Sequence, residues 1–228
     1  MSDWHVFWRG LVLALAAAGL AGCGDSNTWH QKLTVTVETP KGIKSASSVV
    51  SVTMHDTTGN DWMTLPEARG ARYELTGEAV VLELAPGRYL LALLKGLPYA
   101  TNVIFPDEPP VEIAPALADM RASRELSPKQ YPLLVTFADI DDPASVARVD
   151  PDDLAAHFGP GYALSSITLA ITDEPVTKGR VEAVLGWLEK VGRERPTLIP
   201  NPPRLRKDAS DPEIQYLTPG PFSTELFK

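Results

Sequence analysis

The stretch LELAPGRYLLAL, residues 82–93, decides the fold because it holds two strand patterns and the turn between them. Residues 79–84 predict one strand. Residues 89–94 are apolar in succession and predict a second strand that is covered on both faces. Pro86 and Gly87 suit the centre of a type II turn, since proline presets the first φ and glycine accepts a positive second φ. Because such turns fit tight hairpins poorly, we expect this link to carry the chain between two sheets.

Upstream of this stretch the strand pattern recurs. Leu33, Val35 and Val37 alternate with polar residues, which is typical of a half-buried strand. This alternation predicts a strand at 33–38, a β-branched run predicts another at 49–55, and residues 72–75 are expected to form a further strand. The segment 76–78, Thr-Gly-Glu, has the character of a hairpin turn.

The motif Leu84-Ala-Pro-Gly-Arg-Tyr89 and its flanking leucines resemble a signature of prealbumin-like β-sandwich modules in bacterial envelope proteins. The resemblance covers about a dozen residues. It implies an antiparallel β-sandwich for residues 32–96, and it implies no activity because a fold by itself does not define a function.

Downstream, prolines mark a change of character. Residues 97–131 are expected to form a Pro-rich connector with a short helix at 115–126. Residues 132–192 are expected to form a smaller unit with strands and helices, and residues 193–228, which hold seven prolines, a tail with an edge strand at 213–217. The predicted fold class is therefore α+β, an N-terminal antiparallel β-sandwich followed by a smaller mixed α/β unit. Whether the two halves share one core stays open.

Within the unit 132–192, alternating Ile167, Leu169 and Ile171 predict a strand, as does the apolar run 133–137. Asp142-Pro143 and Asp150-Pro151 each have the form of an N-cap followed by proline at the first helical position. An amphipathic helix is expected from about Thr177 to Val191, because apolar residues recur there at helical spacing.

The N-terminus has the features of a secretory signal peptide. Residues 1–22 combine a basic Arg9, an apolar run and a small-residue end. The uncharged stretch 10–22 is too short to span a bilayer, which takes about 20 helical residues. We therefore expect residues 1–22 to be removed.

Leu20-Ala21-Gly22-Cys23 resembles the lipobox of bacterial lipoproteins. The resemblance implies cleavage before Cys23, acylation of its thiol and a polar tether at 23–31 that joins the lipid to the folded part. More than one acyl chain is needed for stable anchoring, which lipoproteins of this type supply. By similarity to proteobacterial sorting rules, Gly24 after the cysteine favours the outer membrane over the inner one, with the folded part facing the periplasm.

Composition excludes several function classes. A net charge of −8 opposes nucleic-acid binding, which needs a basic surface. Cys23 is the single cysteine, so a lipidated chain has no disulfide, no cysteine zinc site and no cysteine nucleophile. No phosphate-binding or dinucleotide-binding glycine motif occurs, and no cofactor is expected.

Three groups of residues carry side chains that could support binding of a metal ion or catalysis. The aspartates at 139, 141, 142, 150, 152 and 153 could hold calcium, although capping roles already account for most of them. The strand 133–137 followed by Asp139 and Asp141 is similar to the start of haloacid dehalogenase-type phosphatases, but Asp142-Pro143 departs from that pattern. His30, His55 and His157 are too far apart in sequence for a local zinc motif, and no nucleophile elbow is present.

The long segment 56–70 carries Trp62 and Met63, two large apolar residues in polar surroundings, which is typical of an interaction site. The alternative is that both pack against the edge of the sandwich. The favoured function is a non-enzymatic module that binds another envelope protein. The alternatives are a small-ligand or glycan-binding lipoprotein and a hydrolase whose site assembles only in three dimensions.

Overall fold

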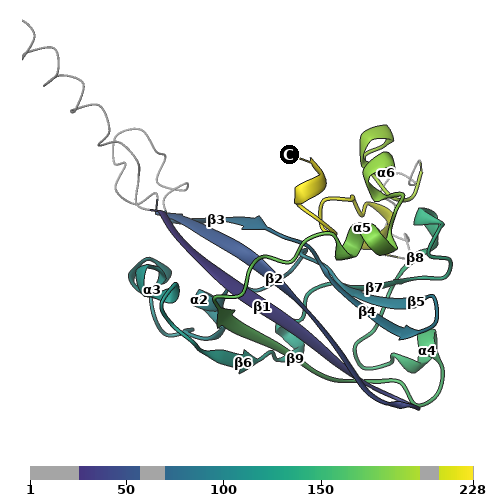
Figure 1. The fold of residues 1–228 in the computed structure, drawn as a ribbon, viewed down its shortest axis with the longest axis horizontal. Coiled ribbons are helices and arrows are strands. Elements are labelled where there is room, and N and C mark those ends of the chain that lie inside the picture. Colours follow the sequence, from purple (N-terminus) through teal and green to yellow (C-terminus); the bar gives the residue numbers. More distant parts are fainter. Residues whose placement is uncertain (1–25, 57–69, 201–210, 228) are drawn as a thin grey trace, which may run out of the picture.

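The computed structural model describes residues 26–56, 70–200 and 211–227 (Figure 1). Two antiparallel sheets and several short helices make up a mixed α+β fold, which confirms the predicted class at this level. The helices and strands are β1 (Ser26–Thr39), β2 (Gly42–Asp56), β3 (Ala71–Thr76), β4 (Val80–Ala85), β5 (Arg88–Ala92), α2 (Ala100–Val103), α3 (Pro110–Leu117), β6 (Ser123–Glu125), η2 (Pro128–Gln130), β7 (Leu134–Phe137), η3 (Pro143–Ser145), β8 (Val146–Arg148), α4 (Ala155–Phe158), β9 (Ala163–Thr172), α5 (Arg180–Val184), α6 (Leu188–Glu194), α7 (Pro212–Gln215) and η4 (Glu225–Phe227). None of the described helices is long and apolar enough to cross a membrane.

The first sheet has the strand order β3-β2-β1-β9-β6. Its centre is a long β1–β2 hairpin, in which Ser26 pairs with His55 at one end and Thr39 with Gly42 at the other. Leu33, Val35 and Val37 point to the buried face of β1, as their alternation predicts. The strand begins at Ser26, so residues 26–31 of the predicted tether belong to the sheet, where Trp29 and Gln31 are buried.

The second sheet has the order β4-β5-β7-β8 and corrects two predicted turns. Pro86-Gly87 closes the β4–β5 hairpin, in which Ala85 pairs with Arg88, and does not link two sheets. A register shift between Glu83 and Ala85 accommodates the turn, because a bulge increases the local twist of the hairpin. The segment 76–78 is the link that carries the chain from β3 in the first sheet to β4 in the second.

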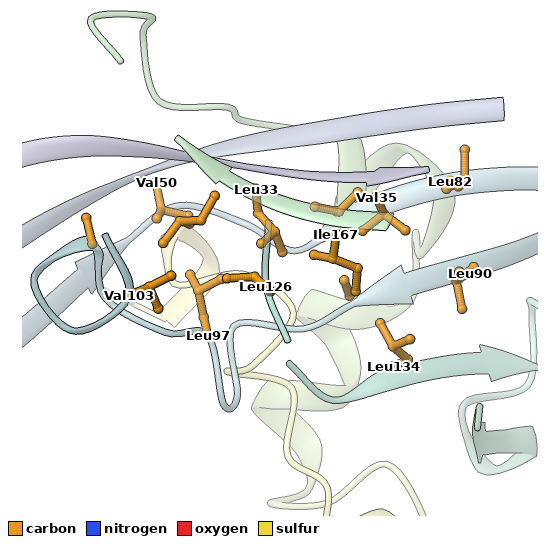
Figure 2. Packing of buried hydrophobic residues seen from close by; sticks show 14 of the residues in the cluster. Leu33, Val35, Val50, Leu82, Leu90, Leu97, Val103, Leu126, Leu134 and Ile167 are labelled. Atoms are coloured by element: carbon orange, nitrogen blue, oxygen red, sulfur yellow. The ribbon is translucent and has the colours of Figure 1, made fainter. Parts of the chain in front are cut away.

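Two apolar clusters cover the two faces of the second sheet. Figure 2 shows the first cluster, in which Leu33 and Ile167 of the first sheet and Leu90 and Leu134 of the second point into one interior. The second cluster lies on the opposite face and includes Leu91 from β5, together with residues from the helices and the C-terminal segment. The prediction that residues 89–94 are covered on both faces is confirmed, because Leu90 and Ala92 belong to one cluster and Leu91 and Leu93 to the other.

The strands of the two halves of the sequence are mixed. In the first sheet β9 pairs with β1 over residues 163–172, and in the second sheet β7 pairs with β5. Residues before 97 and after 131 therefore contribute to the same sheets and to both apolar clusters. This arrangement answers the question that the sequence left open, since the two halves share their core.

Several local predictions are wrong because tertiary pairing overrides the local pattern. Residues 123–125 of the predicted helix 115–126 form β6, whose neighbours Ala122 and Leu126 exchange backbone hydrogen bonds with β9. The predicted edge strand 213–217 begins as the helix α7, which Asp211 caps through the Glu213 and Ile214 N–H groups.

The two predicted helices of the second half are shorter than expected. The amphipathic helix from Thr177 is divided into α5 and α6, since Leu185 leaves the helical conformation with φ −107° and ψ 63°. The N-cap pattern at Asp150 forms a turn in which Asp150 accepts the Asp152 N–H, and α4 begins only at Ala155. By contrast, Asp142 caps η3 as its pattern predicts.

We expect Gly77→Ala to lower the free energy of unfolding by about 2–4 kcal/mol in denaturant titrations. Gly77 has φ +145°, and a Cβ there would lie 2.9 Å from Val50 Cγ1 in the tightly packed link between the sheets. Gly87→Ala is the matched control, since Gly87 also has a positive φ of +71° but open space around it, and should cost about 1–2 kcal/mol. Equal losses in the two variants would contradict the steric argument.

Candidate binding groove

The sequence-predicted sites divide into those that the structure describes and those that it does not. Cys23 and the loop residues Trp62 and Met63 lie outside the described residues. The six aspartates between 139 and 153 and the histidines His30, His55 and His157 lie within the described residues.

The aspartates act as local hydrogen-bond acceptors. Asp139, Asp142, Asp150 and Asp153 each accept a backbone N–H two or three residues further along the chain. Across the described ranges, no group of three or more His, Cys, Asp or Glu side chains is arranged to hold a metal ion.

The three histidines lie on different elements. His30 Nδ1 lies 2.8 Å from the Glu174 carbonyl oxygen, and His157 lies in α4. His55 Nε2 lies 3.6 Å from the Glu74 carboxylate, and Ser26 is its register partner across β1 and β2. In residues 26–56, 70–200 and 211–227 no hydrogen bond joins a serine hydroxyl to a histidine ring, so the structure adds no support to a hydrolytic triad.

The described residues form an open groove of about 450 Å³. Its walls come from the link after β5, from η2 and the start of β7, from the end of β8 and from α7. It is lined by Lys95, Gly96, Pro128, Tyr131, Pro132, Leu133, Leu134, Arg148, Val149, Asp150, Pro151 and Glu213. A second hollow of about 240 Å³ shares Pro151 with the groove and continues along α4 to Tyr162 and Leu164.

Local structure fixes the apolar part of the groove. Ser127 and Gln130 form a capping box around η2, with 2.8 Å between Ser127 Oγ and Gln130 Oε1, and this turn places Tyr131 at the groove. The chain then returns to the sheet, where the Leu133 N–H donates to the Lys95 carbonyl. Burial raises the pKa of the Tyr131 hydroxyl, and the charges of Glu125 and Asp152 raise it further, so the phenol stays neutral.

A four-residue ion network forms the polar part. Arg148 Nε donates to Asp211 Oδ2 at 2.6 Å, and the same guanidinium binds Glu213. Lys95 Nζ lies 3.1 Å from the other Glu213 oxygen. The Arg148 guanidinium holds the pKa of Asp211 and of Glu213 below the usual range, and Lys95 adds to the effect on Glu213.

The network has two positive and two negative members, so its charges balance. It holds α7 against β8 and against the link after β5. The groove therefore combines an apolar, proline-rich surface with a neutral polar wall. Such a surface suits an uncharged or mixed-charge extended ligand better than a strongly anionic or cationic one.

Sequence reasoning missed the groove. Tyr131, Arg148 and Lys95 stand in unremarkable contexts, and nothing local shows that they converge. One signal was available, since Asp211-Pro212 has the same N-cap-then-proline form that predicts η3 at Asp142-Pro143. The Asp211-Pro212 pattern predicts a helix at the position of α7, where we expected an edge strand.

Arg148→Met should lower the free energy of unfolding by about 1 kcal/mol, because these ion pairs are partly exposed and solvent screens them. The lowered carboxyl pKa values stabilise the fold above about pH 4 and lose that effect as the pH falls, so the variant should also lose less stability than wild type on acidification. Arg193→Met, which breaks the exposed helical pair with Glu189, is the control and should cost about 0.3–0.5 kcal/mol. Equal effects in the two variants would show that the network does not anchor α7.

Comparison with known proteins finds no match to a protein-family model, to a curated protein or to a solved structure. Function therefore rests on the sequence features and on the groove.

Proposed function

We propose that the protein is a bacterial lipoprotein that is anchored through acylated Cys23 and binds a segment of another envelope protein in the groove. The lipobox resemblance at 20–23 supports the anchor. β1 begins at Ser26, so three peptide steps, about 11 Å at most, separate the anchored cysteine from the sheet. On this proposal the folded part faces the periplasm, lies close to the membrane surface, and by its Gly24 is sorted to the outer membrane.

The anchor is tested by Cys23→Ser in cells fed radiolabelled palmitate. We expect the wild-type chain to incorporate label and to fractionate with the membrane, and the variant to lose both properties, because the acylated thiol is the attachment point. Separation of inner and outer membranes on a density gradient tests the sorting. A Cys23→Ser chain that stays in the membrane fraction unlabelled would contradict lipid anchoring.

The observation that carries the binding proposal is that the two hollows share Pro151 in their walls and therefore lie next to each other. An extended peptide needs a long, open surface, whereas a small ligand is held in a concave pocket that encloses most of its surface. Prolines and Tyr131 offer rigid apolar contact area, which loses little entropy on binding. A glycan is less favoured, since Tyr131 is the one aromatic residue among those that line the larger hollow.

The scaffold supports this role. We also propose that the two sheets are the layers of a β-sandwich, since Leu33 and Ile167 of one sheet and Leu82 and Leu90 of the other belong to one buried cluster. A rigid β scaffold with a binding surface built from its connecting segments is a common arrangement in recognition modules. No catalytic group is required by this function.

A photoreactive phenylalanine analogue at position 128, an exposed residue on the groove rim, tests the binding in cells. We expect it to give one discrete adduct, and Tyr131→Ala in the same chain should weaken binding about thirtyfold and lower the adduct yield accordingly, since loss of an aromatic anchor costs on the order of 2 kcal/mol. The same analogue at position 43, an exposed site on the β1–β2 hairpin away from the groove, is the control. Identical adducts from both positions, or an adduct unaffected by Tyr131→Ala, would refute the groove as the binding site.

A further inference from the structure

Glu78 is an acidic residue in the interior, in the link between the two sheets. It is 1% exposed, and its carboxylate accepts the backbone N–H groups of Arg180 and Val181 at 3.0–3.2 Å. Its own carbonyl accepts the Ser48 hydroxyl at 2.7 Å. These contacts hold the first turn of α5 against the link.

A second carboxylate, that of Glu182 on α5, lies close to Glu78, and its charge and its closeness both raise the pKa of the Glu78 carboxyl. Glu182 Oε1 accepts the Ser223 hydroxyl at 2.8 Å, whereas the buried Glu182 Oε2 has no hydrogen-bond partner. Two acceptor-only carboxylates cannot hydrogen-bond to each other, and a buried oxygen without a partner is costly. One proton between Glu78 and Glu182 Oε2 supplies the missing donor between the two carboxyl groups and gives Glu182 Oε2 a hydrogen-bond partner.

The two cationic residues that precede Glu182 in the chain, Lys178 and Arg180, have other partners. The Arg180 side chain donates to the Ser47 carbonyl, and Lys178 pairs with Glu225 at 3.6 Å. Burial is the largest effect on Glu78 and raises the pKa of its carboxyl, the backbone N–H groups of α5 lower it, and the Glu182 charge raises it again, with a net rise. The neighbouring residues Ser48 and Ser223 carry no charge.

The C-terminal segment, residues 221–224, is hydrogen-bonded to the backbone on either side of Glu78. The Ala79 N–H donates to the Phe222 carbonyl at 2.9 Å, the Thr224 N–H to the Gly77 carbonyl at 3.0 Å, and the Leu94 N–H to the Pro221 carbonyl at 2.9 Å. Ser223, which is fully buried, forms a bridge with Glu78 and binds Glu182 through its hydroxyl. The segment is thus attached to both Glu78 and Glu182 through Ser223.

We propose that Glu78 and Glu182 share one proton and form a pH-responsive clasp that holds residues 221–224 against the link between the sheets. With the proton in place, every buried oxygen of the pair has a partner. Loss of the proton leaves two negative charges close together, one of them on the fully buried Glu78, and the repulsion and desolvation cost weaken the attachment of the segment. The clasp operates whether or not the groove has a partner.

Denaturant unfolding of the full chain in detergent between about pH 5 and about pH 8 tests the clasp. A folded-state pKa above the unfolded value stabilises the fold at low pH, and that stability is lost as the pH rises through the folded value. We expect the unfolding equilibrium constant of wild type to rise about tenfold for each unit by which the pKa is raised. Glu182→Gln should abolish this dependence, because its amide can accept from Ser223 and donate permanently to Glu78. Glu108→Gln, an exposed acid on another part of the surface, is the control and should retain it.

Hydrogen exchange at single amides provides a second readout that does not require the variant to be stable. Protection factors at Ala79, Leu94 and Thr224 should fall in wild type as the pH rises, and they should fall at a lower pH than those of the β1–β9 pairing, which change only with global stability. A stability curve that is flat in wild type, a Glu182→Gln chain that follows the control, or clasp amides that keep constant protection would each overturn the proposal.

Discussion

The second sheet is apolar on both of its faces, and the rest of the structure follows from the need to cover both. Leu90 and Ala92 of β5 belong to one buried cluster, and Leu91 and the adjoining Leu93 belong to the other. Burial of apolar surface is the main favourable contribution to folding, so neither face can remain exposed. The first sheet covers one face, and α5, α6 and the C-terminal segment cover the other (Figure 1). The chain must therefore return from its last residues to the middle of its sequence.

This return places polar groups at the edges of the second cluster, and both ends of the returning segment are held by charged side chains. At one end Asp211 and Glu213 bind Arg148, and at the other Ser223 binds the Glu78–Glu182 pair. The two attachments respond to pH in opposite directions. The carboxyl pKa values are lowered at the first and the pKa of Glu78 is raised at the second. The first attachment therefore weakens as the pH falls, and on the proposed clasp the second weakens as the pH rises.

Much of the fold could be predicted from the sequence where the pattern was long and periodic. The alternation in β1 and β9 and the apolar run of β5 gave strands with the correct buried faces, since burial repeats every second residue in a strand. The prediction of turns was less successful. Pro86-Gly87 was predicted to link two sheets but closes the β4–β5 hairpin, because the bulge at Glu83 accommodates the turn. The segment 76–78 was predicted to be a hairpin turn but links the two sheets, because Gly77 adopts a φ of +145°. The groove could not be predicted at all, since Lys95, Tyr131, Arg148 and Glu213 come from four separate segments.

The sequence by itself determined the α+β class, the buried faces of the long strands and the expectation of a lipid anchor at Cys23, because these depend on residues that are neighbours along the chain. The tertiary structure alone decided that β9 lies beside β1, that residues 123–125 form a strand, and that Glu78 meets Glu182 and Ser223. Each of these depends on contacts between residues more than 40 positions apart. The free energy of these long-range contacts exceeds the weak helix or strand preferences of short segments. The local sequence pattern therefore does not indicate these contacts.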